Sequence, residues 1–450
     1  MTTLAPGRPE PHGRKTLVAR VVRQRGGSPA RDFFQNLVVK LPRSLAPLAE
    51  PNFRLLWMGQ AVSAVGDSMT SIALAFATLS LTRSASALGV VLGISVVGTM
   101  IALPVGGVWS DRLPRQLVML TSDVVRALVH AIVGVLLITG HAQLWQLAAG
   151  AFTFSFAGGF FQPASSALTP QTVSAPLLQR ANALMGLSRS ATNVAGPAVA
   201  GILVALIGPG WVFVIDAATF VVSAISLALL RVDGVAGKAK ANFWSELAEG
   251  LRAVTGRRWY LLNLGAHALW NFAIAAFFVL GPLVAKQRLG GPSAWGLISA
   301  SMGVGAIAGG LIALRATPRR PLVVANLVLI PAAFMLVAIA VPLPTFGIMG
   351  VCVIGWAGLT FLNEVWFATV PQLIPQEVLA RASSFDWLLS LVAMPVGFVV
   401  SGPLADHIGI PTTLLGAAAL MAVPCFLITL VPGVRHVRRT EAGTIVMEAV

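Results

Sequence analysis

The sequence predicts an all-α membrane protein whose twelve transmembrane helices form two parallel six-helix repeats. The first observation is composition: 56% of the 450 residues are hydrophobic and only 10% are charged, against about 45–50% and about 25% in soluble domains. The second is a series of twelve apolar runs, each long enough to cross about 30 Å of hydrocarbon as a helix. The third is a likeness between the two halves of the chain.

The apolar runs account for most of the chain. Because lipid cannot hydrogen-bond the backbone, each run must be a helix unless the runs close a barrel. Barrel strands would alternate apolar and polar residues over about ten positions, which these runs do not. The runs occupy residues 55–80, 87–109, 117–139, 143–163, 183–208, 211–231, 260–285, 294–315, 321–341, 344–367, 384–405 and 412–432.

The basic residues predict the orientation. If both termini are cytoplasmic, the loops on the opposite side receive only Arg83, Lys286 and Arg288, and nearly all other Lys and Arg residues fall on the cytoplasmic side. Such an asymmetry is typical of membrane proteins, in which positively charged loops lie on the cytoplasmic side. The net charge of +15 therefore indicates topology and not binding to nucleic acid. We expect a multi-pass protein of the cytoplasmic (inner) cell membrane.

The same pattern predicts the domain organisation. Phe243, Leu247, Leu251 and Val254 recur at helical spacing in the longest internal connection, which predicts a short amphipathic helix on the inner membrane surface. The predicted parts are a basic, mostly disordered cytoplasmic tail (1–50), an N-terminal bundle (51–231), a cytoplasmic linker (232–258), a C-terminal bundle (259–432) and a cytoplasmic tail (433–450).

An internal repeat supports the division into halves. A shift of 201 positions aligns TPQTVSAPLLQRA (169–181) with VPQLIPQEVLARA (370–382). Parallel repeats of this kind describe a transporter architecture whose substrate site lies between the halves near the bilayer midplane. The same shift pairs Gly196 and Gly201 with Gly397 and Gly402.

The loop after the second run, GGVWSDRLPRQ (106–116), resembles the signature of the major facilitator superfamily, G-x-x-x-D-[RK]-x-G-[RK]-[RK]. Pro114 and Gln116 depart from that pattern. The resemblance implies a gate, in which an acid and bases at helix ends pair across the halves and separate when the halves rock. An ordinary turn with topogenic charges is the alternative. The matching residues are Gly107, Asp111, Arg112 and Arg115.

The fifth run contains NVAGPAVAGI (193–202), which resembles the antiporter motif G-P-x-x-G-G of exporters in the same superfamily. Gly196, Pro197 and Gly201 match, and Ala200 replaces one glycine. The resemblance implies efflux with proton exchange. Close helix packing by small residues is the alternative.

Other stretches, 59–74, 121–128, 213–224 and 383–406, are similar to the bacterial branch that contains enterobactin-type siderophore exporters and macrolide efflux pumps, which are drug:proton antiporters. The resemblance covers about residues 50–432. It implies the same twelve-helix fold and an exporter's function. The basic residue that many such antiporters carry in the fourth helix is absent, since 143–163 holds no Arg or Lys.

Charged residues inside apolar runs are candidates for proton coupling, because a charge in the membrane is costly and faces a cavity or a partner. Asp67 lies near mid-membrane and is the first choice, with structural pairing as the alternative. Asp123 and Arg126 are spaced for an ion pair on one helix face, and Arg189 is a second candidate partner for Asp123. The other candidates for proton coupling are Asp123, Glu364 and Asp386.

Uncharged polar residues in the runs are candidates for the substrate pocket. A single histidine on an apolar face is more often a satisfied core residue, which is the alternative for His267. Asp216 we interpret as a helix-capping acid. The pocket candidates are Asn193, His267, Trp270 and Asn271.

These observations predict a secondary active exporter of a small amphipathic organic molecule (a drug, siderophore or secondary metabolite) that works by proton antiport and alternating access. An importer or facilitator of the same fold and a non-transporting receptor or scaffold are the alternatives. The chain matches none of the common catalytic motifs, so we expect no enzyme activity, no cofactor and no metal site. The expected partners are the lipid bilayer, the substrate and protons, with no nucleic acid, and the chain is expected to be a monomer.

Overall fold

The computed structural model describes residues 42–232, 256–341 and 343–447. In this part of the chain eleven helices are long and apolar enough to cross a membrane. A shorter apolar segment, Val392–Ile408, lies at the C-terminal end of a further long helix. The structure thus shows an all-helical membrane protein, and the count of twelve spans stays a prediction.

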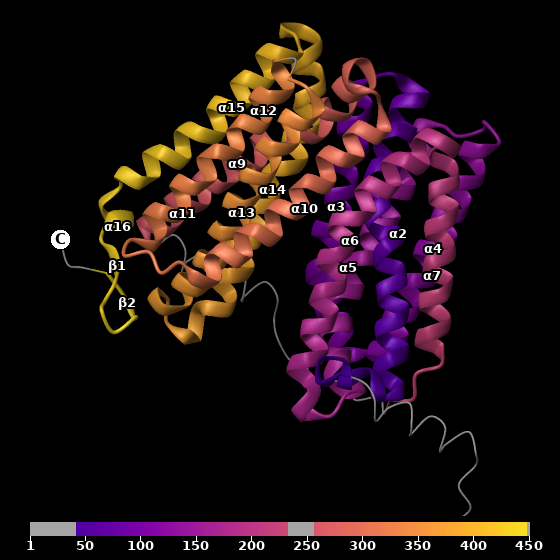
Figure 1. Ribbon diagram of the computed structural model, residues 1–450, viewed down its shortest axis with the longest axis horizontal. Coiled ribbons are helices and arrows are strands. Elements are labelled where there is room, and N and C mark those ends of the chain that lie inside the picture. The colour runs from indigo at the N-terminus through magenta and orange to yellow at the C-terminus, as the bar shows by residue number, and fades with distance from the viewer. Residues whose placement is uncertain (1–41, 233–255, 342, 448–450) are drawn as a thin grey trace, which may run out of the picture.

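The first six long helices pack on one another and form the group on the right of Figure 1, which we call the N-half. Two short 3-10 helices accompany them, η2 (Arg43–Ala49) and η3 (Ala175–Leu177). The helices are α2 (Pro51–Thr82), α3 (Ala85–Arg112), α4 (Arg115–Ile138), α5 (Leu144–Thr172), α6 (Leu178–Ile207) and α7 (Pro209–Ala228).

The later helices form the group on the left of Figure 1, which we call the C-half. One of its spans is interrupted by a 3-10 turn at Ile330–Ala332 (η5), which contains Pro331. The elements are α9 (Arg258–Val284), η4 (Ala285–Leu289), α10 (Pro292–Arg315), α11 (Pro321–Leu329), η5, α12 (Ala333–Ala340), α13 (Thr345–Leu373), α14 (Gln376–Ile408), α15 (Ile410–Leu427), η6 (Ile428–Leu430) and α16 (Pro432–Arg435).

The C-terminal segment forms a small hairpin that the sequence did not predict. Strands β1 (Val437–Arg439) and β2 (Ile445–Met447) pair antiparallel. The Ile445 N–H donates to Gln372 Oε1 at 3.0 Å, so the hairpin is fastened to the end of α13. Most of the predicted N-terminal tail (1–41) and the predicted amphipathic helix (242–254) lie outside the described residues.

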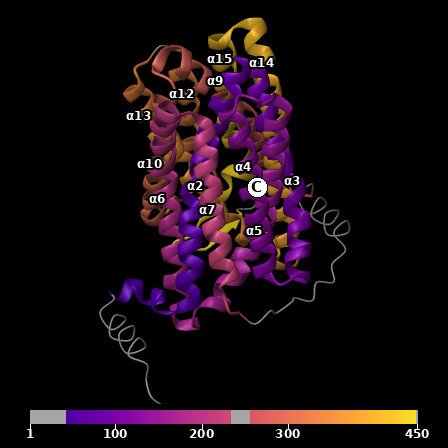
Figure 2. The same cartoon turned by 90° about the vertical axis from the view of Figure 1, so that its right-hand side faces the viewer.

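Most of the arginines that begin or end the helices lie at one end of the molecule, which we call the basic end; they include Arg115, Arg258 and Arg315. The opposite end, where α2 gives way to α3, is called the far end. In Figure 1 the two halves meet at the far end, at the top, and diverge toward the basic end. Figure 2, turned by 90°, shows the helices of the N-half running nearly parallel to one another between the two ends.

The halves contact each other along two helix pairs, α6 with α10 and α3 with α14. We call these contacts the far-end seam because they use the far-end halves of all four helices. A Cβ on Gly201 would lie 3.0 Å from Gly296 Cα, and the Ser86 hydroxyl donates to Asp406 Oδ2 at 3.0 Å. Lys286 reaches across as well and donates to the Leu79 carbonyl at 2.8 Å.

The paired glycines of the sequence repeat occupy equivalent places in the two halves. Gly196 and Gly397 each face the first helix of their own half, at Ser68 of α2 and at Phe272 of α9. Gly201 and Gly402 instead face the other half, on α10 and α3. Side chains at these four positions would collide with the facing helices. Glycine therefore permits the close approach on which both packing contacts depend.

Candidate transport site

One face of α4 carries a stripe of charged and polar side chains into the N-half. Asp123, Arg126 and His130 are spaced i, i+3 and i+7, so they share one helix face. Their side chains are all buried, while Leu128 and Ile132 on the other face are more than half exposed. The charged face of α4 is therefore turned inward and its apolar face outward.

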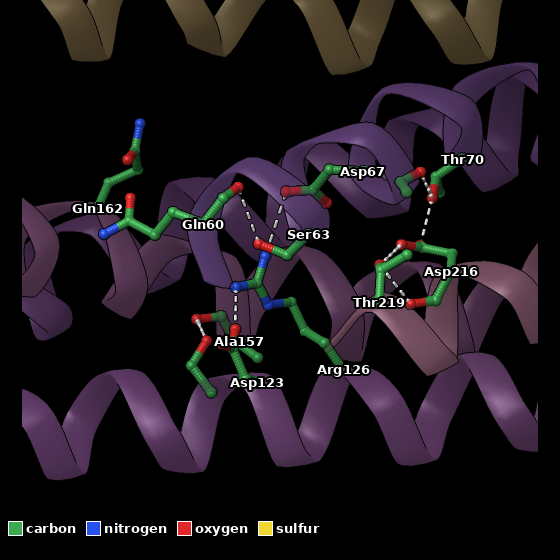
Figure 3. A network of polar contacts seen from close by, with 12 residues as sticks. Gln60, Ser63, Asp67, Thr70, Asp123, Arg126, Ala157, Gln162, Asp216 and Thr219 are labelled. Carbon is green, nitrogen blue, oxygen red and sulfur yellow. Dashed lines mark hydrogen bonds and ion pairs between the residues drawn. The ribbon is translucent and has the colours of Figure 1, made fainter. Parts of the chain in front are cut away.

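Arg126 joins α4 to α2. Its Nη2 donates to Asp123 Oδ1 at 2.5 Å, and its Nη1 donates to Asp67 Oδ2 at 3.4 Å. Figure 3 shows Asp67 and Asp123 reaching the guanidinium from two different helices. The side chain of Asp123 is fully buried, whereas that of Asp67 is 42% exposed. Asp67 is thus the member of this triad that a solute or a proton can reach.

Asp216 of α7 forms the second part of the network. Its Oδ2 accepts a hydrogen bond from the Thr70 hydroxyl at 2.8 Å and lies 2.6 Å from His130 Nδ1. Its Oδ1 accepts from Thr219 at 3.1 Å. The N-cap of α7 is Gly208, and Asp216 lies about two turns beyond it. The interpretation of Asp216 as a capping acid was wrong, because its carboxylate points sideways to α2 and α4.

Aromatic rings surround Arg126 and His130, the two basic side chains of the network. The Arg126 guanidinium lies 4.2 Å from the centroid of the Phe220 ring and 4.6 Å from that of Phe161. The His130 ring stacks on Phe154 with a centroid distance of 4.0 Å. Cation–π contacts of this kind are strongest where water is excluded. The rings hold the two basic side chains in place without adding a charge.

Two glycines allow α2 to come close to its neighbours at this level. A Cβ on Gly66 would collide with the Asp216 carboxylate and the Thr219 hydroxyl. A Cβ on Gly196 would collide with the Ser68 side chain, next to Asp67. The antiporter motif therefore supports the helix that carries Asp67 on one side and, through Gly201, contacts the C-half on the other.

Asp67 lies where three cavities meet. The largest, about 550 Å³, runs toward the basic end between Gln60, Arg189 and other residues of the N-half. The second, about 450 Å³, lies between the halves and is bordered by the seam residues Pro197 and Phe398. The third, about 220 Å³, runs inside the N-half to His130. The Asp67 carboxylate thus faces three spaces: the cavity toward the basic end, the interface between the halves and the interior of the N-half.

The cavity between the halves is mostly apolar. Its walls carry Asp67 and Asn193 from the N-half, and aromatic and sulfur-containing side chains from the C-half. Aromatic surfaces with few polar groups are typical of small-molecule sites. The C-half contributes Phe278, Trp295, Met302, Trp356, Met394 and Phe398.

A separate cavity of about 210 Å³ lies in the C-half. Three of the pocket candidates, His267, Trp270 and Asn271, line it, so they do not share a cavity with Asn193. Asp386 also lines it and accepts hydrogen bonds from Trp366 Nε1 at 2.8 Å and from the Tyr260 hydroxyl at 3.2 Å. The sequence grouped these residues into one pocket, and the structure divides them between two.

Arg189 is not in contact with Asp123: its Nη2 donates to Gln162 Oε1 at 2.7 Å, in the largest cavity. Glu364 is exposed on α13 and does not line any of the four cavities described. Both residues therefore lie apart from the charged network, which the sequence alone could not show.

The gating motif lies at the basic end of α3 and the start of α4. The side chains of Asp111 and Arg112 and the surroundings of Gly107 are not described, although α3 runs to Arg112. Arg115 Nη1 donates to the Ala167 carbonyl of α5 at 3.0 Å. This base is thus engaged within its own half in the conformation described.

Sequence reasoning missed His130 altogether. Its signal was available, because His130 continues the i, i+3 pair of Asp123 and Arg126 by one more turn on the same face. The partner of His130 could not have been found in that way, since Asp216 lies on α7 and only tertiary packing brings the two side chains together.

Comparison with known proteins places this architecture in a family. Residues 43–444 match the family model MFS_3, described as transmembrane secretion effector. Macrolide efflux protein A of Streptococcus pyogenes is 24% identical over 365 residues, which cover 80% of this chain and 90% of that protein. The multidrug efflux pump Tap of Mycobacterium tuberculosis H37Rv is 26% identical over 397 residues, covering 82% and 90%.

Solved structures show the same fold at low identity. The nucleoside transporter NupG superimposes with a TM-score of 0.68 at 14% identity, covering 84% of this chain and 98% of its own. A bacterial homologue of the iron transporter ferroportin, in an inward-facing state, gives 0.64 at 18% identity, covering 84% and 98%. At these identities the likeness concerns the fold alone.

Proposed function

The chain belongs to the MFS_3 family of transmembrane secretion effectors, and we propose that it exports a small amphipathic organic molecule from the cytoplasm in exchange for protons. It is a membrane transporter of the major facilitator superfamily and not an enzyme. We place it in the cytoplasmic membrane as a monomer, with the basic end and both termini in the cytoplasm and twelve spans. The distribution of Lys and Arg supports this orientation.

The proposal of proton coupling rests on one observation. Asp67 is paired with Arg126 and lines all three cavities of the N-half and the interface. A proton on Asp67 removes its charge and weakens its bond to Arg126. A polar or cationic group of the substrate entering from the basic end would meet the same carboxylate. Proton and substrate thus compete for one group, so that binding of one favours release of the other, which is one way to couple movement in opposite directions.

The shape of the molecule supports alternating access. The halves are joined at the far-end seam and diverge toward the basic end, which is the cytoplasmic end in the proposed orientation. The cavity of about 550 Å³ beside Asp67 also lies toward that end. Helix α3 carries Ser86 at the seam and Asp111 at its other end. Rocking about the seam would move the gating motif farthest, and we assign to Asp111, Arg112 and Arg115 the closing of the basic end.

The substrate class follows from the cavity between the halves. Its C-half wall is rich in aromatic and sulfur-containing side chains, and its N-half wall carries one carboxylate, one amide and two serine hydroxyls. This lining fits a molecule with an apolar body and a polar or basic group. The names of the macrolide and multidrug efflux relatives support a drug or a secondary metabolite as cargo.

Efflux from cells tests the proposal directly. Cells expressing the chain are loaded with ethidium, a macrolide antibiotic or a siderophore, and export is measured with and without a protonophore. We expect export of at least one compound that stops when the protonophore is added. Export that continues unchanged would contradict proton coupling, and accumulation in place of export would contradict the direction.

The gate is tested by Asp111→Ala. Because the substitution leaves the cavity walls intact, we expect slower turnover with little change in the substrate concentration that gives half-maximal export. Glu441→Ala, which removes an exposed acid of the C-terminal hairpin, is the control for loss of an acid away from the gate and the seam. Unchanged turnover in Asp111→Ala would remove Asp111 from the gate.

A further inference from the structure

The N-half network has more acids than the single proton site proposed above requires. It brings together three carboxylates, Asp67, Asp123 and Asp216, with one guanidinium and one imidazole. Arg126 balances one carboxylate, so the group is neutral only when two protons are bound among the three acids and His130. Uncompensated charge within a membrane protein is costly. The charge balance thus points to a second proton-binding group.

His130 and Asp216 are placed to be that group. Both side chains are buried, with exposed fractions of 2% and 0%, and the ring nitrogen lies 2.6 Å from the carboxylate. The charged or titratable side chains that face them are Asp67 from α2 and Asp123 and Arg126 from α4. From α5 the ring meets Phe154. Among the described residues, Arg126 is the permanent cation near the pair, and its guanidinium is bonded to Asp123 and Asp67 and not to Asp216.

A cavity joins the pair to Asp67. His130 and Asp67 line the same space of about 220 Å³, and Thr70, Ser71, Ser95 and Ser155, which carry hydroxyl groups, also line it. A space of this volume has room for several waters at about 30 Å³ each, and the hydroxyl groups on its otherwise mostly apolar wall can hydrogen-bond to them. Thr70 also donates to Asp216, so the wall of the cavity and the buried pair are directly connected.

We propose that His130 and Asp216 form a second proton-binding station that exchanges its proton with Asp67 through this cavity. The inference rests on the proposed proton-coupled function. His130 takes a proton at Nε2 and becomes an imidazolium paired with the Asp216 carboxylate. It then gives one proton to the Asp67 carboxylate through water, which leaves neutral imidazole at position 130 and a neutral acid at position 67. No electron is transferred and no other bond changes.

The station lies on the far-end side of Asp67. Leu147 and Gly150, near the far-end start of α5, line the same cavity. In the proposed orientation a proton from outside would reach Asp67 along the inside of the N-half, while substrate approaches from the basic end. The proton and the substrate would then arrive at Asp67 by different routes.

The test needs no substrate. Infrared spectra of the purified full-length protein in detergent follow the protonated-carboxyl band through a pH titration, and Asp67→Asn identifies the part of the band that belongs to Asp67. Interacting sites titrate as a coupled pair. We expect His130→Gln to move the midpoint of the Asp67 band by about one pH unit or more.

His267→Gln is the matched control, since it removes the other histidine buried in the described spans and should leave the Asp67 band where it is in the wild type. If His130→Gln lowers the yield of folded protein, the double variant His130→Gln/Asp216→Asn replaces the pair by two neutral amides and is titrated in its place. If the Asp67 band titrates in either variant as it does in the wild type, the proposal of a second proton-binding station is wrong.

The same measurements distinguish a failure of this inference from a failure of the proposed function. Protonophore-sensitive export by the wild type together with an unmoved Asp67 band would overturn the second station alone. A moved band in a chain whose export ignores the protonophore would support the station and contradict proton antiport.

Discussion

The two halves of the molecule share a helical plan but differ in what they bury. The N-half holds a network of acidic and basic side chains, Asp67, Asp123, Arg126, His130 and Asp216, of which all but Asp67 are buried. The C-half instead surrounds its cavity with amides, a histidine, tryptophans and the carboxylate of Asp386. The packing glycines recur in both halves, so the difference lies in the side chains that the helices carry and not in their arrangement. We therefore expect the transported protons to bind in the N-half, whereas the C-half provides an apolar wall of the cavity between the halves.

The largest expected effect comes from Asp67→Asn. The amide keeps the size of the side chain but cannot exchange a proton, so proton-driven export should fall to the level of cells without the protein, with the amount in the membrane unchanged. Asp386→Asn, in the C-half, is the matched control and should retain proton-driven export. Normal proton-driven export by Asp67→Asn would break the assignment of coupling to the N-half.

Next comes Arg126→Ala, which leaves two acids without their shared partner. Breaking a buried ion pair costs about 3–5 kcal/mol, so the variant should lose much of its thermal stability in detergent, as measured by the temperature at which the monodisperse peak disappears. Arg189→Ala removes an arginine that bonds to Gln162 and should change that temperature little. Equal stability of both variants would show that the network is not structural.

A smaller effect is expected at the far-end seam. Gly201→Val would push its side chain into the backbone of α10, where even a Cβ is too close to Pro292 and Gly296, and overpacking costs about 1–3 kcal/mol. The seam should then loosen and transport should slow, while binding of substrate from the basic end persists. Gly186→Val, on the same helix but in open space, is the control. Equal transport rates of Gly201→Val and Gly186→Val would show that transport does not depend on close packing at the seam.

The smallest effect is expected from the C-half cavity. His267→Gln keeps a polar side chain and Trp270→Phe keeps an aromatic ring, but both alter the hydrogen-bonding groups of the wall. They should change the apparent affinity for individual compounds by about tenfold or less, since one hydrogen bond contributes about 0.5–1.5 kcal/mol, and leave sensitivity to a protonophore intact. Trp145→Phe, at the exposed far end of α5, is the control. Loss of protonophore sensitivity in either variant would show that the C-half takes part in coupling.

The sequence by itself determined the class of protein and most of its helices. Apolar runs of about 20 residues admit few structures in lipid, because every backbone group must be satisfied within the span. The i, i+3 spacing of Asp123 and Arg126 determined that both side chains leave α4 on one face. The glycines of the repeat marked where helices approach closely, since no other residue leaves room for a facing backbone.

Tertiary structure alone decided which charges meet. Asp67, Arg126 and Asp216 lie on three helices far apart in the chain, and periodicity within one helix carries no information about which face of another it touches. Packing turned Asp216 from an expected cap into a partner of His130, and it placed Arg189 beside Gln162 and not beside Asp123. It also divided the predicted pocket, because Asn193 faces the interface between the halves, whereas His267 and Asn271 face the interior of one.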